Sequence, residues 1–160
     1  MDNLRDHTTI LKPVSGPDPA LGDLQGLLQL WEGHRHEGRL PRRADFDPLD
    51  LKKFLGRIVL FDVLQDPRRF RFRLVGTDWV LRFGLDPTNT LVDDFPRVES
   101  RPFINEVLGQ VADGRVPLWV RRAVVIEGRY YHYGMLLMPL AADGRQADMI
   151  MAGFDLKPGG

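Results

Sequence analysis

Three arginines alternate with apolar residues in the segment RRFRFRLVG, residues 68–76. Arginine carries a permanent charge and a planar fork of N–H donors, so a row of arginines can bind a phosphate or a carboxylate. Alternate side chains of a β-strand point to opposite faces, so the same pattern also describes the polar side of a strand. The other side of that strand would carry Phe70, Phe72 and Leu74.

The preceding segment RADFDP, residues 43–48, offers two acidic partners for these arginines. We expect Arg73 to pair with Asp45 or Asp47, or with a backbone carbonyl, and so to fasten the leading segment to the sheet. The whole chain has 22 Lys+Arg and 22 Asp+Glu, whereas nucleic-acid-binding domains usually have an excess of basic residues. The arginines are therefore interpreted as a local structural clamp, and nucleic acid is not an expected partner.

Carboxylates cluster at residues 45–50 and 93–94, where they could bind a hard metal or transfer protons. No histidine accompanies either cluster at metal-ligand spacing, and Asp47 precedes a proline where a helix is expected to begin. The two serines, Ser15 and Ser100, lie in no Gly-x-Ser-x-Gly motif. The chain has no cysteine, which excludes disulfides and thiol nucleophiles. We therefore predict no catalytic and no metal-binding residues, and the chain is not expected to be an enzyme.

The length and composition indicate one folded domain. The chain has 160 residues, of which 43% are hydrophobic and 28% charged. It contains no run of about 18 apolar residues and no signal-peptide core at its start, so the expected location is the cytoplasm. We assign residues 1–17 to a flexible arm, 18–156 to a single domain with an N-terminal helical extension, and 157–160 to a tail.

Apolar spacing predicts a leading helix from Asp18 to about Gly38, with shorter helices over residues 47–55 and 77–83 and a longer one over 100–114. The leading helix has one apolar stripe, formed by Leu21, Leu24, Leu28 and Trp31. This stripe must be buried on the sheet of its own chain or against a second copy. The leading helix is therefore either a cover or a dimer helix.

Five strands are predicted from apolar and β-branched runs. They span residues 58–63, 70–75, 116–127, 130–140 and 147–156. Short glycine-containing turns between the last three favour antiparallel hairpins. The sequence thus predicts an α+β domain with a five-stranded antiparallel sheet, helices inserted on one face, and the N-terminal helix on or near the other face.

The order of these elements, with three motifs, resembles the PAS domain, and in particular a bacterial group of single-domain PAS proteins formerly described as a domain of unknown function. The motifs are LPRRADFDP at 40–48, FRLVGT at 72–77 and LLMPLAADG at 136–144, and the resemblance covers about residues 27–156. It implies a small-molecule pocket between the sheet and the inserted helices. It also implies a regulatory role in signal transduction, through dimerisation or contact with another protein.

The resemblance also limits the cofactors. PAS light sensors that bond a flavin or another chromophore covalently need a cysteine, which this chain lacks. PAS domains that bind haem commonly take a histidine ligand from the long helix or nearby, and residues 100–114 contain none. His132 is the one histidine that the predicted strands place near a pocket. The cofactor is therefore left open, and haem is not expected.

Three functions follow from this interpretation. The first is a cytoplasmic sensory domain with a small ligand, for which we predict these pocket residues: Phe72, Leu74, Trp79, Phe83, Phe103, Val107 and His132. The second is a ligand-free dimerisation or adaptor module. The third is a cone-shaped α+β enzyme of the isomerase or dehydratase kind, which would need a buried acid–base pair. The expected partners are a second copy of the chain, a small molecule and a signalling protein, with no membrane span.

Overall fold

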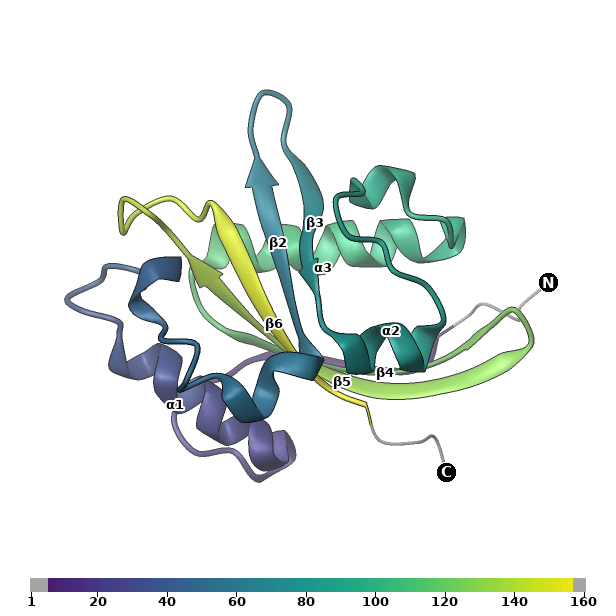
Figure 1. Cartoon of the computed structure of the whole chain (residues 1–160), viewed down its shortest axis with the longest axis horizontal. Coiled ribbons are helices and arrows are strands. Elements are labelled where there is room, and N and C mark those ends of the chain that lie inside the picture. Colours follow the sequence, from purple (N-terminus) through teal and green to yellow (C-terminus); the bar gives the residue numbers. More distant parts are fainter. Residues whose placement is uncertain (1–5, 157–160) are drawn as a thin grey trace.

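The computed structural model describes residues 6–156, which form one antiparallel sheet with helices on both of its faces (Figure 1). The strands are β1 (Asp6–Pro13), β2 (Ile58–Leu64), β3 (Arg69–Val75), β4 (Leu118–Ile126), β5 (Arg129–Leu140) and β6 (Met149–Asp155). The α-helices are α1 (Gln25–Gly33), α2 (Thr77–Phe83) and α3 (Arg101–Gly114). The 3₁₀ turns are η1 (Pro19–Leu24), η2 (Arg43–Asp45), η3 (Lys52–Arg57), η4 (Val92–Asp94) and η5 (Val98–Ser100).

The sheet has six strands in the order β1-β4-β5-β6-β2-β3, one more than the sequence predicts. The additional strand is β1, which pairs antiparallel with β4 from Asp6 to Pro13. The prediction of a flexible arm is therefore wrong for these residues. Their strand has no partner nearby in sequence, because β4 lies more than a hundred residues further along the chain. Residues 1–5 of the predicted arm and the predicted tail, 157–160, lie outside the described residues.

The leading segment covers one face of the sheet. The predicted stripe is buried there to within 1% exposure, with Leu21, Leu24, Leu28 and Trp31 all in the core. The indole Nε1 of Trp31 donates a hydrogen bond of 2.9 Å to the carbonyl of Pro139 in β5. A Cβ on Gly153 of β6 would collide with Leu27, so the helix lies directly against the strand. In this structure the helix is therefore an intramolecular cover.

The opposite face is covered by α2, η4, η5 and α3 (Figure 1). The chain turns from β3 into α2 at Gly76, whose backbone lies against Gly56 so closely that a side chain at position 76 would collide with the Gly56 carbonyl. Gly84 ends α2 in the left-handed region, with φ of 78°. The predicted helix over 77–83 is confirmed, and two glycines fix where it begins and ends.

The leading helix is shorter than predicted. It ends at Gly33 instead of Gly38, where the His34 amide donates to the Trp31 carbonyl, and the chain continues through turns to η2. The predicted helix over 47–55 is a turn followed by η3. None of the helices within residues 6–156 is long and apolar enough to cross a membrane.

The predicted clamp between Arg73 and the leading segment is wrong. Asp45 instead accepts hydrogen bonds from the backbone and side chain of Arg42. Two arginines of β3, Arg71 and Arg73, share a partner in the neighbouring strand, because Asp62 of β2 lies opposite Arg71 in the register. Arg71 donates to Asp62 Oδ2 over 2.8 Å, whereas Arg73 is 3.9 Å from the same oxygen. The second proposed aspartate, Asp47, caps a local turn by accepting from the Leu49 amide.

Candidate ligand-binding site

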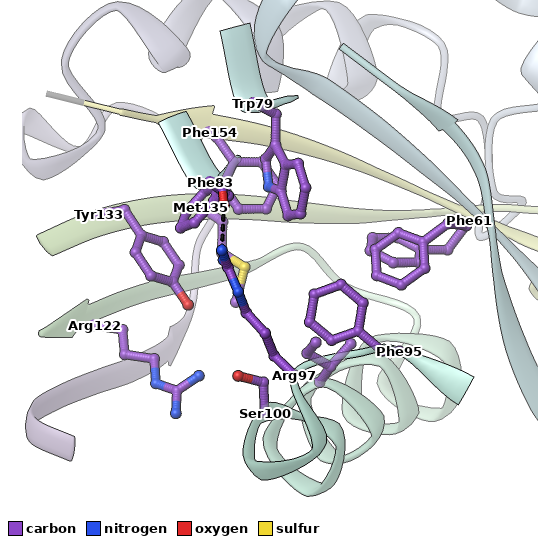
Figure 2. Close-up of a pocket in the computed structure, with 12 residues that line it drawn as sticks. Phe61, Trp79, Phe83, Phe95, Arg97, Ser100, Arg122, Tyr133, Met135 and Phe154 are labelled. Carbon is purple, nitrogen blue, oxygen red and sulfur yellow. Dashed lines mark hydrogen bonds between the residues drawn. The ribbon is translucent and has the colours of Figure 1, made fainter. Parts of the chain in front are cut away.

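A cavity lies between the sheet and the chain that runs from α2 to α3 (Figure 2). Its volume is about 50 Å³, which is room for roughly four water molecules. The lining residues are Phe61, Phe72, Trp79, Phe83, Phe95, Arg97, Ser100, Ile104, Arg122, Tyr133, Met135 and Phe154. Aromatic rings therefore form most of the wall, and a few polar groups are set into it.

This part of the aromatic wall comes from β2, β3, α2 and the segment after η4. Phe61 and Phe72 are direct partners in the β2–β3 register, with ring centroids 4.9 Å apart. Trp79 and Phe83 are one helical turn apart on α2, with centroids 4.6 Å apart. Phe95, after η4, stacks on Phe72 at 5.3 Å. These contacts give the cavity a largely aromatic wall, which is suited to an apolar group.

The two central strands form the floor of the cavity. Met135 of β5 and Phe154 of β6 are opposite each other in the register, so they share one face of the sheet. Tyr133 lies two residues before Met135 on the same face, and its ring meets Phe83 at 5.4 Å. The floor therefore ties the sheet to α2.

Two polar groups of the wall have unusual hydrogen bonding. Arg97 extends across the cavity, and its guanidinium donates to the backbone carbonyl of Phe83 (Figure 2). Trp79 is 6% exposed, and its indole Nε1 is buried without a hydrogen-bond partner in residues 6–156. Buried N–H groups are nearly always paired, so the indole of this lining residue is a free donor.

Two further polar residues line the cavity near the start of α3. Arg122 of β4 is 5% exposed, and its guanidinium lies 3.9 Å from the ring centroid of Phe103. Ser100 is 7% exposed and immediately precedes α3. No carboxylate and no imidazole is present among the lining residues. The wall is thus rich in donors and positive charge.

Three of the predicted pocket residues, Phe72, Trp79 and Phe83, line this cavity. Leu74 does not, and it is 41% exposed. The β2–β3 register shifts between Leu60 and Phe61, so that an extra residue of β3, Arg73, bulges out of the ladder. A bulge reverses the alternation of side chains, so Leu74 is turned to the face opposite Phe72.

The other three predicted pocket residues also lie outside the cavity lining. On α3, Ile104 takes the lining position, whereas Val107 is core at 1% exposure and Phe103 packs against Arg122. On β5, Tyr133 faces the cavity, so the preceding residue, His132, points to the other face. Whether Phe72, Trp79 and Phe83 contact a ligand stays a prediction.

Sequence reasoning missed nine lining residues: Phe61, Phe95, Arg97, Ser100, Ile104, Arg122, Tyr133, Met135 and Phe154. The alternation in β5 could have identified Tyr133 and Met135 once one face was chosen correctly. Nothing local marks Arg97, which reaches the cavity from an irregular segment between η4 and η5. Its role depends on where that segment crosses α2.

The two cofactor classes suggested by the resemblance do not fit this cavity. A covalent flavin needs a cysteine that the chain lacks, and a volume of about 50 Å³ is far below that of a flavin ring system. No histidine lines the cavity to ligate a haem iron. Elsewhere in residues 6–156, no group of three or more His, Asp or Glu side chains could hold a metal ion.

Two solved structures are similar to this chain, and the first of them supports the fold described above. An RNA-binding Light-Oxygen-Voltage receptor gives a TM-score of 0.53 at 12% identity over 92% of this chain, which spans 38% of that receptor's length. The PAS domain of Bordetella pertussis BvgS gives a TM-score of 0.49 at 20% identity, over 71% of this chain and 89% of that domain. No curated protein matches the chain.

A family model described as a PAS domain matches residues 22–153, which is most of the chain. The alternative prediction of a cone-shaped α+β fold, of the isomerase or dehydratase kind, is therefore wrong. In the antiparallel sheet, the helices α2 and α3 are inserted between β3 and β4. By this match and this topology, the chain belongs to the PAS domain family, whose members are in general sensory and signalling modules.

Proposed function

We propose that this PAS domain senses a small molecule in the cavity between the sheet and α2, and reports its presence by contact with a second copy or a signalling protein in the cytoplasm. The proposal includes no catalytic step of its own. The observation that carries it is the ring-lined cavity, whose wall includes Trp79 with a buried indole N–H that has no hydrogen-bond partner in residues 6–156. Pockets of this kind, apolar with a few polar groups, are typical of small-molecule sites.

The cavity wall offers a route from ligand to surface. Trp79 and Phe83 contact the cavity from one side of α2, whereas Leu81 of the same helix is 81% exposed. A ligand larger than a few atoms must displace part of the wall, because the cavity is small. Movement of α2 would then change the surface around Leu81, where a partner could dock.

Methionine methyl groups provide a direct test. Met135 lines the cavity, whereas Met138 and Met151 are opposite each other on the face covered by α1. Titration of the whole chain with xenon and with a library of small neutral and charged fragments should move the Met135 methyl resonance and leave the other two in place. If no fragment moves Met135 at millimolar concentration, the ligand-binding function is wrong.

A second function, a ligand-free homodimer or adaptor, is favoured by the small volume of the cavity. In this case the exposed leucine of α2 would contact a second copy. Sedimentation of the wild type should then show a dimer that Leu81→Asp dissociates. Leu49→Asp is the matched control, because Leu49 is 77% exposed in another part of the surface. A wild type that stays monomeric at high concentration contradicts the homodimer.

A further inference from the structure

The polar residues that line the cavity include several donors and no acidic residue. Arg97, Arg122 and the Trp79 indole all present N–H groups, and no lining residue is acidic. Hydroxyls of Ser100 and Tyr133 complete the polar part of the wall. A ligand that matches this wall must supply acceptors.

Arg97 is the cation best placed to bind such a ligand. The guanidinium donates to the neutral carbonyl of Phe83 and lies 5.9 Å from the Tyr131 ring, and it makes no ion pair with any residue in 6–156. A carboxylate binds a guanidinium through two parallel hydrogen bonds, each stronger than a bond to a neutral carbonyl. An anion in the cavity would therefore compete successfully with Phe83 for Arg97.

The surroundings increase the positive potential at this point. Arg82 and Arg129 lie over the same Tyr131 ring, at 4.8 and 5.9 Å from its centroid. Tyr131 in turn stacks on Phe83, with ring centroids 5.3 Å apart. Clustered charge beside a low-dielectric wall raises the local concentration of anions.

We infer that the cavity binds a small monocarboxylate with a flat apolar body. This inference rests on the proposed function and names its ligand class. The carboxylate accepts hydrogen bonds from the Arg97 fork and the Trp79 indole, and the body lies between the aromatic rings. A carboxylate fits better than a phosphate, because a doubly charged group loses more hydration in a ring-lined cavity than these donors replace.

Binding would also change the end of α2. The Phe83 carbonyl lies in the last turn of this helix, where Arg97 stabilises the negative end of the helix dipole. A carboxylate that takes over Arg97 removes this cation from the helix terminus. The amide of Gly84, the residue that ends α2, should therefore respond to the ligand together with the indole of Trp79.

The test uses NMR of the whole chain with paired probes: acetate and acetamide, isobutyrate and isobutyramide, benzoate and benzamide. The chain has three tryptophans, and their indole N–H signals are assigned with Trp79→Phe. A carboxylate of the panel should move the Trp79 signal downfield, whereas the Trp31 signal should not move because that indole already donates to Pro139. The matching amide should bind roughly tenfold more weakly or worse.

Arg97→Met should weaken carboxylate binding by roughly tenfold or more, and should leave amide binding nearly unchanged. Arg68→Met is the matched control, because Arg68 also lies over an aromatic ring, that of Phe70, but neither residue lines the cavity. It should retain most of the affinity. If Arg97→Met does not fold, the comparison of carboxylate with amide in the wild type still decides the ligand class.

Three results would overturn the inference. If amides or xenon move Trp79 or Met135 as strongly as the carboxylates do, the cavity is a neutral site and the proposed sensory function stands without this ligand class. If inorganic phosphate binds more tightly than every carboxylate, the cavity is a phosphate site and the monocarboxylate class is wrong. If no probe moves either residue, the inference and the ligand-binding function fall together.

Discussion

At the scale of single residues, Asp62 organises the charged side of the hairpin formed by β2 and β3. Its side chain is 14% exposed, and it accepts hydrogen bonds from Nε and Nη2 of Arg71 at 3.1 and 2.8 Å. Arg73 is 57% exposed and 3.9 Å away. The two arginines look equivalent in the sequence, yet only Arg71 forms a close ion pair.

We predict that Arg71→Ala lowers the free energy of unfolding by about 1 kcal/mol, because it leaves the half-buried Asp62 without its nearest cation. Arg73→Ala should change it by less than about 0.5 kcal/mol. Urea unfolding of both variants measures the difference. A larger loss for Arg73 would mean that the more distant arginine is the main partner.

Gly134 of β5 is needed for a close contact with Trp119. A Cβ at this position would lie 2.8 Å from Cζ2 of the Trp119 ring, which is 1% exposed and cannot move away. Gly134→Ala should lower the free energy of unfolding by about 1–3 kcal/mol in thermal denaturation. Gly109→Ala on α3 is the control, since nothing lies within 4 Å of its added methyl group. It should stabilise the helix by up to about 1 kcal/mol.

The sequence could predict the aromatic residues of the cavity better than its polar ones. Phe72, Trp79 and Phe83 follow from alternation in a strand and from one helical turn. The prediction for Leu74 is wrong because of the bulge beside it, and that bulge depends on the pairing of β3 with β2. Arg97 reaches the cavity from an irregular segment and Arg122 from β4, so only the packed fold brings them together.

At the scale of elements, one hydrogen bond connects the cover helix to the sheet. The Trp31 indole on α1 donates to the buried carbonyl of Pro139, and both residues are far apart in sequence. Trp31→Phe keeps most of the apolar ring but removes this donor. We predict a loss of about 1–3 kcal/mol in urea unfolding, since a buried carbonyl is left without it.

Leu30→Ala on the same helix is the comparison for Trp31→Phe, because Leu30 is only partly buried. Leu30→Ala should lower the free energy of unfolding by less than Trp31→Phe does if the hydrogen bond is the main contribution of Trp31. If Trp31→Phe is as stable as the wild type, another donor forms a hydrogen bond with the Pro139 carbonyl in the variant.

The start of the leading segment should respond to acid. The Lys12 ammonium, 2.9 Å away, and the amide of Ala20 hold the pKa of the Asp18 carboxyl below its usual value. A group whose pKa is lowered by folding stabilises the fold above the unfolded pKa of about 4, and this contribution is lost as pH falls through the folded pKa.

We predict that Asp18→Asn flattens this dependence, because asparagine can still cap η1 but does not titrate. Urea unfolding between about pH 5 and about pH 2 should show the gap between wild type and variant closing as the pH falls. A constant gap would mean that Asp18 has the same pKa in the folded and unfolded chain.

Most elements could be predicted from local patterns. The helix over 77–83 and the later strands follow from apolar spacing and from glycine-containing turns, which act over a few residues. The exceptions are β1, whose partner β4 is distant in sequence, the early end of α1, and the helix expected over 47–55, which is a turn followed by η3. The strand β1 needs β4 as a template, and α1 ends at Gly33, where the His34 amide donates to the Trp31 carbonyl.

At the scale of the whole molecule, the leading segment is part of the core rather than an accessory. Its buried leucines and Trp31 pack on the face formed by β5 and β6. Deletion of residues 1–36 would expose that face, so we predict loss of cooperative unfolding and aggregation of the truncated chain. Circular dichroism with thermal melting provides the measurement, and a truncated chain that melts cooperatively as a monomer would contradict this role.

The outer edge of β3 is closed by the chain itself. The Phe72 amide donates to the Thr90 carbonyl over 2.9 Å, and the Phe72 carbonyl accepts from the Asn89 amide over 2.7 Å. The bulge at Arg73 distorts the same edge. Exposed strand edges are where one protein adds a strand to the sheet of another. A partner is therefore excluded from extending the sheet beside Phe72, and recognition on that side must use side chains instead of backbone pairing.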